Sequence, residues 1–106
     1  MAKKFRIFYT TSQNIIDAEE IANHILKNFK AICVNIFENV NSFYLEKKKI
    51  KSQKEVVLFI KTFQKKNEIE KIIKEIHKYD TPIIVEIKTG EPNRDYLNWF
   101  LNELEI

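Results

Sequence analysis

The sequence is poor in glycine, cysteine and proline, and each shortage excludes a class of protein. One glycine and two prolines in 106 residues leave no room for collagen-like repeats or a low-complexity linker. A phosphate-binding P-loop and a dinucleotide-binding fingerprint each need several glycines, and this chain has only Gly90. Because Cys33 is the single cysteine, neither an intrachain disulfide nor a cysteine-only zinc site can form.

Long apolar runs are also missing. No stretch of about 18 uncharged apolar residues occurs, so the sequence predicts no membrane span. The opening Met-Ala-Lys-Lys-Phe-Arg lacks the apolar run and cleavage signal of a signal peptide. We therefore expect a cytoplasmic protein without a membrane partner.

The composition is that of one folded domain. Hydrophobic residues make up 44% of the chain and charged residues 31%, which is typical of a globular protein and not of a disordered one. The length is enough for one domain and too short for two. We expect a single domain over residues 1–106.

The charge is mildly basic, and its only local concentration is a lysine-rich stretch at residues 47–54. Eighteen Lys and Arg against fifteen Asp and Glu give a net charge of +3, too little to indicate nucleic-acid binding. The lysines could form an anion-binding patch or keep a hairpin tip soluble and unpaired. We favour the hairpin tip, because all but two of the cationic residues are lysine and arginine is the better reader of phosphates and bases.

The hydrophobic pattern predicts seven secondary-structure elements in the order β-α-β-β-α-β-α. It predicts strands over residues 4–10, 31–44, 49–63 and 83–88, and helices that follow capping residues at Asn14, Asn67 and Asn93. The first six elements indicate an α+β fold, the ferredoxin-like split βαβ sandwich, to which a C-terminal helix is added. Two helices then cover one face of a four-stranded antiparallel sheet.

Both faces of this predicted sheet are apolar, which is unusual for a sheet with helices on one side only. We place Ile7, Val34, Leu58 and Val85 on one face, and on the opposite face Phe8, Cys33, Phe37, Val57, Phe59 and Ile84. Two helices cannot cover both faces, and a large exposed apolar patch most often marks a protein interface. We therefore expect a homo-oligomer, in the form of a closed symmetric ring.

Several short motifs, in one order along the whole chain, resemble those of the CutA family of divalent-cation tolerance proteins. Residues 31–36, Ala-Ile-Cys-Val-Asn-Ile, are similar to the family's AACVNI strand, and residues 55–62 fit its E-V-x-L-x-I-K-T pattern. Further matches lie at residues 42–44, 77–82 and 95–99. The resemblance implies a homotrimer in which the hairpin of the second and third strands reaches into a neighbouring subunit. It implies a role in tolerance of copper and other divalent metals, and no enzymatic reaction.

The chain departs from the family pattern at a few positions. Glu46 and Lys48 replace the family's Trp and Gly near the hairpin tip, Lys78 replaces a Pro, and Ile83 replaces a Glu. Members with an additional Cys and His have them where this chain has Tyr9 and Ile76. The departures leave the predicted fold intact and put the family's metal ligands in question.

Two sets of side chains are candidates for a binding site. His77 and Cys33 are the metal candidates, because imidazole is the commonest transition-metal ligand and thiolate suits copper(I). Their alternatives are a helix-end histidine and a small buried hydrophobe. From the resemblance, Lys61, Tyr79 and Tyr44 would approach an intersubunit cleft and bind a small anion or metabolite there; the alternative is an ion pair across the interface.

No catalytic residues are predicted, because two histidines and one cysteine are too few to build a nucleophile with its base. The expected function is that of a non-enzymatic CutA-like trimer in the response to metal ions. It requires no cofactor, would take copper or another divalent cation as its ligand, and has a protein partner still to be identified. The alternative is a PII-like trimeric sensor that binds an anion or metabolite in its intersubunit clefts.

Overall fold

The computed structural model describes residues 3–104, so residues 1–2 and 105–106 of the predicted domain lie outside it. Its elements follow the predicted order. They are β1 (Arg6–Ser12), α1 (Ile15–Lys27), β2 (Cys33–Glu46), β3 (Lys49–Thr62), α2 (Lys66–Lys74), β4 (Ile84–Ile87) and α3 (Arg94–Leu104). Within the described residues, no helix is long and apolar enough to cross a membrane.

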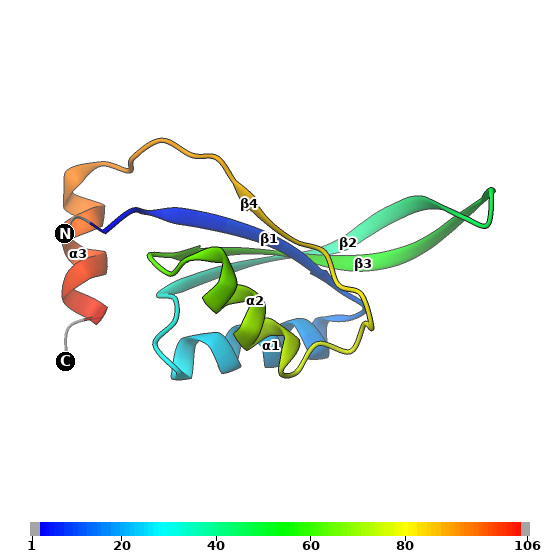
Figure 1. Cartoon of the computed structure of the whole chain (residues 1–106), viewed down its shortest axis with the longest axis horizontal. Coiled ribbons are helices and arrows are strands. Elements are labelled where there is room, and N and C mark those ends of the chain that lie inside the picture. The colour runs from blue at the N-terminus through cyan, green and yellow to red at the C-terminus, as the bar shows by residue number, and fades with distance from the viewer. Residues whose placement is uncertain (1–2, 105–106) are drawn as a thin grey trace.

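The four strands form one antiparallel sheet in the order β2-β3-β1-β4, with α1 and α2 on one side of it (Figure 1). Strand β3 lies between β1 and β2, so the first βαβ unit is split by a strand that comes later in the sequence. The predicted α+β class and the four-stranded antiparallel sheet are therefore confirmed.

The β2–β3 hairpin extends far beyond the rest of the domain and gives the molecule its elongated shape, 47 × 26 × 24 Å (Figure 1). We call the projecting part, residues 40–55, the arm. Where the arm begins, the pairing of β2 with β3 shifts between Phe37 and Val40, and Asn39 has a positive φ of 60°. This β-bulge turns Val40 to the same face as Phe37, although the two residues are three apart.

The first two helices begin differently. Asn14 caps α1, because its side-chain oxygen accepts a hydrogen bond from the backbone N–H of Asp17 at 2.8 Å, as predicted. The predicted cap of α2 at Asn67 is wrong, because α2 starts at Lys66 and its N-cap, Lys65, makes no side-chain capping bond. Asn67 instead lies within the first turn of α2.

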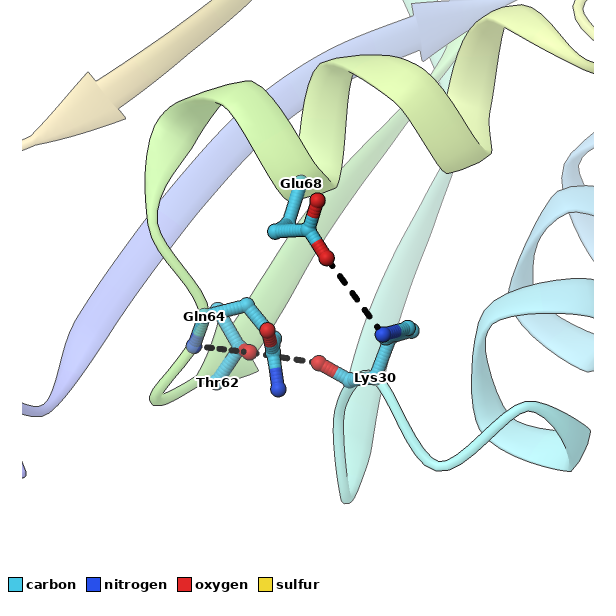
Figure 2. A network of polar contacts seen from close by, with 4 residues as sticks. All are labelled: Lys30, Thr62, Gln64 and Glu68. Carbon is cyan, nitrogen blue, oxygen red and sulfur yellow. Dashed lines mark hydrogen bonds and ion pairs between the residues drawn. The ribbon is translucent and has the colours of Figure 1, made fainter.

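A buried threonine connects the loops that precede β2 and α2 (Figure 2). The hydroxyl of Thr62 donates to the carbonyl of Lys30 at 2.5 Å and accepts from the backbone N–H of Gln64 at 2.9 Å. The ammonium of Lys30 also lies 3.5 Å from the carboxylate of Glu68 on α2. These contacts satisfy backbone groups in two connections that would otherwise lack partners.

The main core lies between the sheet and the two helices. Phe8, Leu58 and Ile60 are fully buried there, and the helix residues that pack against the sheet are Ala18, Ile21, Ile25, Ile69, Ile72 and Ile73. The predicted assignment of side chains to the two faces of the sheet is partly wrong, because Phe8 and Ile84 belong to this helix-covered side.

The cause of this error is strand register. Phe8 pairs with Ile60, and Ile84 pairs with Thr10, which itself pairs with Leu58, so these side chains share one face of the sheet. Ile7 and Val85 point to the opposite face, because neighbouring residues of a strand alternate between faces.

That opposite face, the open face, is apolar and largely uncovered. Tyr9, Phe37 and Phe59 form an aromatic cluster, with the ring of Phe59 5.9 Å from Tyr9 and 5.3 Å from Phe37. The exposed fractions of Phe37, Val85 and Ile87 are 49%, 42% and 37%. Apart from the end that α3 occupies, no helix in the described part of the chain covers it (Figure 1).

Helix α3 lies across one end of the sheet, beside the start of β1 (Figure 1). Its buried Phe100 packs against Phe63 and Phe5, with ring centroids 4.7 and 5.9 Å away. The backbone N–H of Leu97 donates to the carbonyl of Asn93, so the helix starts at the predicted cap.

Candidate functional site

A groove of about 430 Å³ lies where the arm joins the body, and we call it the arm groove. Strands β1, β2 and β3 and the loop between α2 and β4 contribute its lining residues, which are Thr11, Ser42, Tyr44, Gln53, Glu55, Tyr79 and Thr81. All but one of these side chains are uncharged and polar or aromatic. The exception is the carboxylate of Glu55.

The bulge at the start of the arm places the strand residues of the groove on one face. Ser42 pairs with Gln53 and Val40 pairs with Glu55, so these side chains continue the open face along the arm. Without the extra residue, the polar side chains of β2 would point to the opposite side of the hairpin.

The hydroxyl of Tyr79 donates a hydrogen bond of 2.8 Å to the carboxylate of Glu55, and the side-chain amide of Gln53 donates to the same hydroxyl at 3.4 Å. Burial and the bond to Glu55 raise the pKa of Tyr79 well above its ordinary value. Burial by itself would raise the pKa of Glu55, but hydrogen bonds from Ser42, Tyr79, Thr11 and Gln53 together lower it. The groove therefore holds an ionised carboxylate surrounded by neutral donors.

His77 holds the loop between α2 and β4 against β1. Its Nδ1 accepts from the backbone N–H of Tyr79 at 3.0 Å, so Nε2 carries the proton and donates to the carbonyl of Thr11 at 2.7 Å. The imidazole also contacts the ring of Tyr79, with the ring centroids 5.0 Å apart and the two planes tilted by 47°. Both ring nitrogens are thus engaged within the chain, and they position Tyr79 for its bond to Glu55.

Cys33 and Lys61 lie together at the other end of the sheet. Cys33 pairs with Lys61, and Lys61 with Ile7, whereas His77 contacts Thr11 at the far end of β1. Four residues of strand, about 13 Å, separate these two positions along β1. The ammonium of Lys61 lies 5.8 Å from the ring centroid of Tyr96 on α3.

Within one chain, the members of each predicted set of site residues therefore lie apart from one another: His77 from Cys33, and Lys61 from the two tyrosines. It brings Tyr44 and Tyr79 together in the arm groove and leaves Lys61 with Cys33 elsewhere. No group of three or more His, Cys, Asp and Glu side chains that could hold a metal ion occurs in residues 3–104. The described residues of a single chain do not fit a metal centre.

The sequence pattern did not identify the other lining residues, Thr11, Ser42, Gln53, Glu55 and Thr81, as site residues. Ser42 and Glu55 belong to motifs that were recognised, but nothing in the chain pattern relates them to Tyr79. Residues 51–55, Lys-Ser-Gln-Lys-Glu, are polar throughout, so no alternation in the sequence marks which of them face the groove.

The fold and the site define a class of protein. Its members are α+β domains with an antiparallel sheet, a long projecting hairpin and an uncovered apolar sheet face. Residues 6–103 match the family described as "CutA1 divalent ion tolerance protein". The chain belongs to the CutA family, as the motifs in its sequence predicted.

Individual relatives agree with this membership over nearly the whole chain. The divalent-cation tolerance protein CutA of Pyrococcus horikoshii is 37% identical over 98 residues, which cover 92% of this chain and 95% of the relative. The crystal structure of the divalent ion tolerance protein CutA1 from Ehrlichia chaffeensis covers all of both chains with a TM-score of 0.91 at 30% identity. The structure of the periplasmic divalent cation tolerance protein CutA from Archaeoglobus fulgidus has a TM-score of 0.89 at 31% identity, covering 96% of this chain and all of that one.

Proposed function

We propose that this protein is a homotrimer that takes part in the response to copper and other divalent metal ions and catalyses no reaction. Family membership supports the role in divalent-cation tolerance. The observation that carries the proposal of assembly is the open face, where Val85 and Ile87 remain exposed together with Phe37 of the aromatic cluster. An apolar face of this kind favours a partner, and a second copy of the chain presents the same face.

The oligomeric state tests this proposal directly. Size exclusion with light scattering, run over a range of concentrations, should give a constant mass of three chains. Phe59→Lys places a charge at the centre of the aromatic cluster and should abolish the assembly, because an ammonium buried in an apolar interface lacks a partner.

Ile16→Lys is the matched control for that variant. Ile16 is an apolar residue on α1 with 66% of its surface exposed, on the helix side of the sheet, and its replacement should leave the mass unchanged. A constant mass of one chain for the native protein would contradict the proposal, as would a well-folded trimer of Phe59→Lys.

The metal roles of His77 and Cys33 remain proposals. Because both ring nitrogens of His77 are engaged, copper binding there requires the loop to release Thr11 or Tyr79. We therefore expect weak binding, in which ligands from more than one chain complete the coordination. Titration with copper(II) should show affinity that falls in His77→Ala and Cys33→Ser. Tight stoichiometric binding that survives His77→Ala would exclude His77 as the ligand.

We also propose a cytoplasmic location, and a protein partner that is still to be identified. The Archaeoglobus relative is described as periplasmic and an Arabidopsis thaliana relative as chloroplastic, so members of this family are not confined to one compartment. Fractionation of cells that produce the native chain tests the location.

A further inference from the structure

We propose that the arm groove binds an organic cation, an ammonium or guanidinium group, between the carboxylate of Glu55 and the aromatic side chains of Tyr44 and Tyr79. This inference does not rest on the proposed function, because it is drawn from the contacts of a single chain. It differs from the expected anion site, in which Lys61 joins the two tyrosines across a subunit interface. Within one chain Lys61 lies at the far end of β3, so the groove of a single chain carries only the negative charge of Glu55.

The first step concerns charge. Glu55 is the only carboxylic acid among the lining residues, and the groove presents it with hydroxyl and amide donors from neutral side chains. Among the described residues, no Lys, Arg or His side chain lies within ion-pair distance of its carboxylate. A half-buried carboxylate that is stabilised as an anion and has no counter-ion is favourably placed to bind a cation.

The second step concerns the neighbouring lysines, which are not placed to neutralise Glu55. Lys51 is on the same face of the arm but lies 2.7 Å from the carboxylate of Glu46. Lys54 is adjacent in sequence, so its side chain leaves β3 on the opposite face. The negative charge of the groove therefore remains for a ligand.

The third step concerns the kind of cation. Tyr44 and Tyr79 both line the groove, and aromatic faces attract ammonium and guanidinium groups. A divalent metal ion needs several anionic or carbonyl ligands, and one carboxylate with hydroxyl groups does not supply them. A single positive charge on an organic group matches the single negative charge of Glu55.

Such a group could come from two sources. One is a small amine in solution, and the other is a lysine or arginine side chain of a second copy of this chain that reaches into the groove. Both have the same recognition chemistry, and the experiment separates them.

The first part of the experiment measures binding of small cations by NMR. Backbone amide shifts of the groove residues are followed during titration with 1,4-diaminobutane or methylguanidinium, with 1,4-butanediol as the neutral analogue. We expect saturable shifts with the cations and none with the diol. Glu55→Gln keeps the size of the side chain and one acceptor oxygen for the Tyr79 hydroxyl but removes the charge, and it should weaken binding by about tenfold or more.

Two further variants serve as controls for the NMR titration. Tyr44→Leu removes one aromatic wall and leaves the Glu55–Tyr79 bond in place, so it should fold normally and bind the cations several-fold more weakly. Glu19→Gln, an exposed acid on α1, should bind as the native chain does. Equal affinity of Glu55→Gln and Glu19→Gln would overturn a small-amine site.

The second part of the experiment tests whether the bound cation is a side chain from another copy of the chain. A carbodiimide joins carboxylates to amines that are in contact, and mass spectrometry locates the bond formed. If the cation is a neighbour's lysine, the native protein should show an interchain link at Glu55 that is absent from Glu55→Gln. A neighbour's arginine gives no such link, but Glu55→Gln should then dissociate on dilution more readily than Glu19→Gln.

The proposal is overturned if the native chain shows no response to cations, no interchain link at Glu55 and no dependence of its assembly on Glu55. The mass measurement identifies failure of the proposed function separately. A monomer that still binds amines through Glu55 would contradict the trimer and support the groove.

Discussion

The hydroxyl of Tyr79 donates a hydrogen bond of 2.8 Å to the carboxylate of Glu55, and this contact joins the loop after α2 to the base of the arm. The two residues are 24 positions apart in the sequence. His77 fixes the backbone of Tyr79 from the other side, through its contacts with Tyr79 itself and Thr11. The bond therefore couples the position of the loop to that of the hairpin.

This bond gives a pH window for stability. The pKa of Glu55 is lowered in the folded state, so its contribution is present above its ordinary value of 4.5 and is lost as the pH falls through the folded value. The pKa of Tyr79 is raised, so its contribution is present below its ordinary value of 10 and is lost as the pH rises through the folded value. We expect both contributions in full between these two ordinary values.

Urea unfolding at a series of pH values measures this window. Tyr79→Phe should lower the free energy of unfolding by about 1 kcal/mol at neutral pH and reduce the loss of stability at alkaline pH. Tyr96→Phe, on α3 and remote from the groove, is the control and should have a smaller effect at neutral pH. Equal losses in the two variants would show that the bond to Glu55 adds nothing to stability.

The buried hydroxyl of Thr62 supports a second prediction. Thr62→Val keeps the shape of the side chain but leaves the carbonyl of Lys30 and the N–H of Gln64 without their partner (Figure 2). Thermal unfolding should show that the free energy of unfolding falls by about 1–3 kcal/mol, the cost of leaving buried polar groups without partners. Thr89→Val, in an exposed loop, should change stability by less than about 0.5 kcal/mol. A Thr62→Val variant as stable as the native chain would contradict this.

The turn at the tip of the arm carries strain that substitution should relieve. Lys47 and Lys48 have positive φ angles of 51° and 65°, a conformation that suits Asn-Gly and is unfavourable for lysine. The double variant Lys47→Asn, Lys48→Gly should raise the free energy of unfolding by about 1–2 kcal/mol. Lys49→Gly, on the adjoining strand, should lower it, because glycine weakens a strand. A double variant no more stable than the native chain would show that the turn is not strained.

The end of α1 allows a similar test at Phe29. The N–H groups of Phe29 and Lys30 donate to the carbonyls of Leu26 and Ile25, and Phe29 occupies the left-handed position, with a φ of 57°, where glycine is preferred. Because 57% of its surface is exposed, little packing is lost on replacement. We expect Phe29→Gly to be more stable than Phe29→Ala by about 1 kcal/mol in chemical unfolding, since only glycine removes the strain. The reverse order would contradict the assignment.

Much of the fold follows from local patterns. The apolar stripe of α1 and its cap at Asn14 are properties of a short segment, and the structure confirms both. The prediction at Asn67 was wrong because two candidate caps, two residues apart, differ little in local preference. The connection after Thr62 decides between them, since its hydroxyl accepts from Gln64 and ends the strand there.

The faces of the sheet could be predicted only in part. Alternation within a strand shows which residues share a side, but it does not give the register between strands. Phe8 and Ile84 were therefore placed on the wrong face. The conclusion that both faces are apolar did not depend on these assignments, and the open face bears it out.

The sequence by itself determined the order of the elements, the two apolar sheet faces and the family, because each depends on residues close together or on motifs in a fixed order. Only the tertiary structure decided which side chains meet. A one-residue bulge at the start of the arm and a loop held by His77 bring Glu55 to Tyr79, while strand pairing places Lys61 beside Cys33 at the opposite end. The physical reason is that a site is formed by contacts between segments distant in the chain, and register and loop position set those contacts.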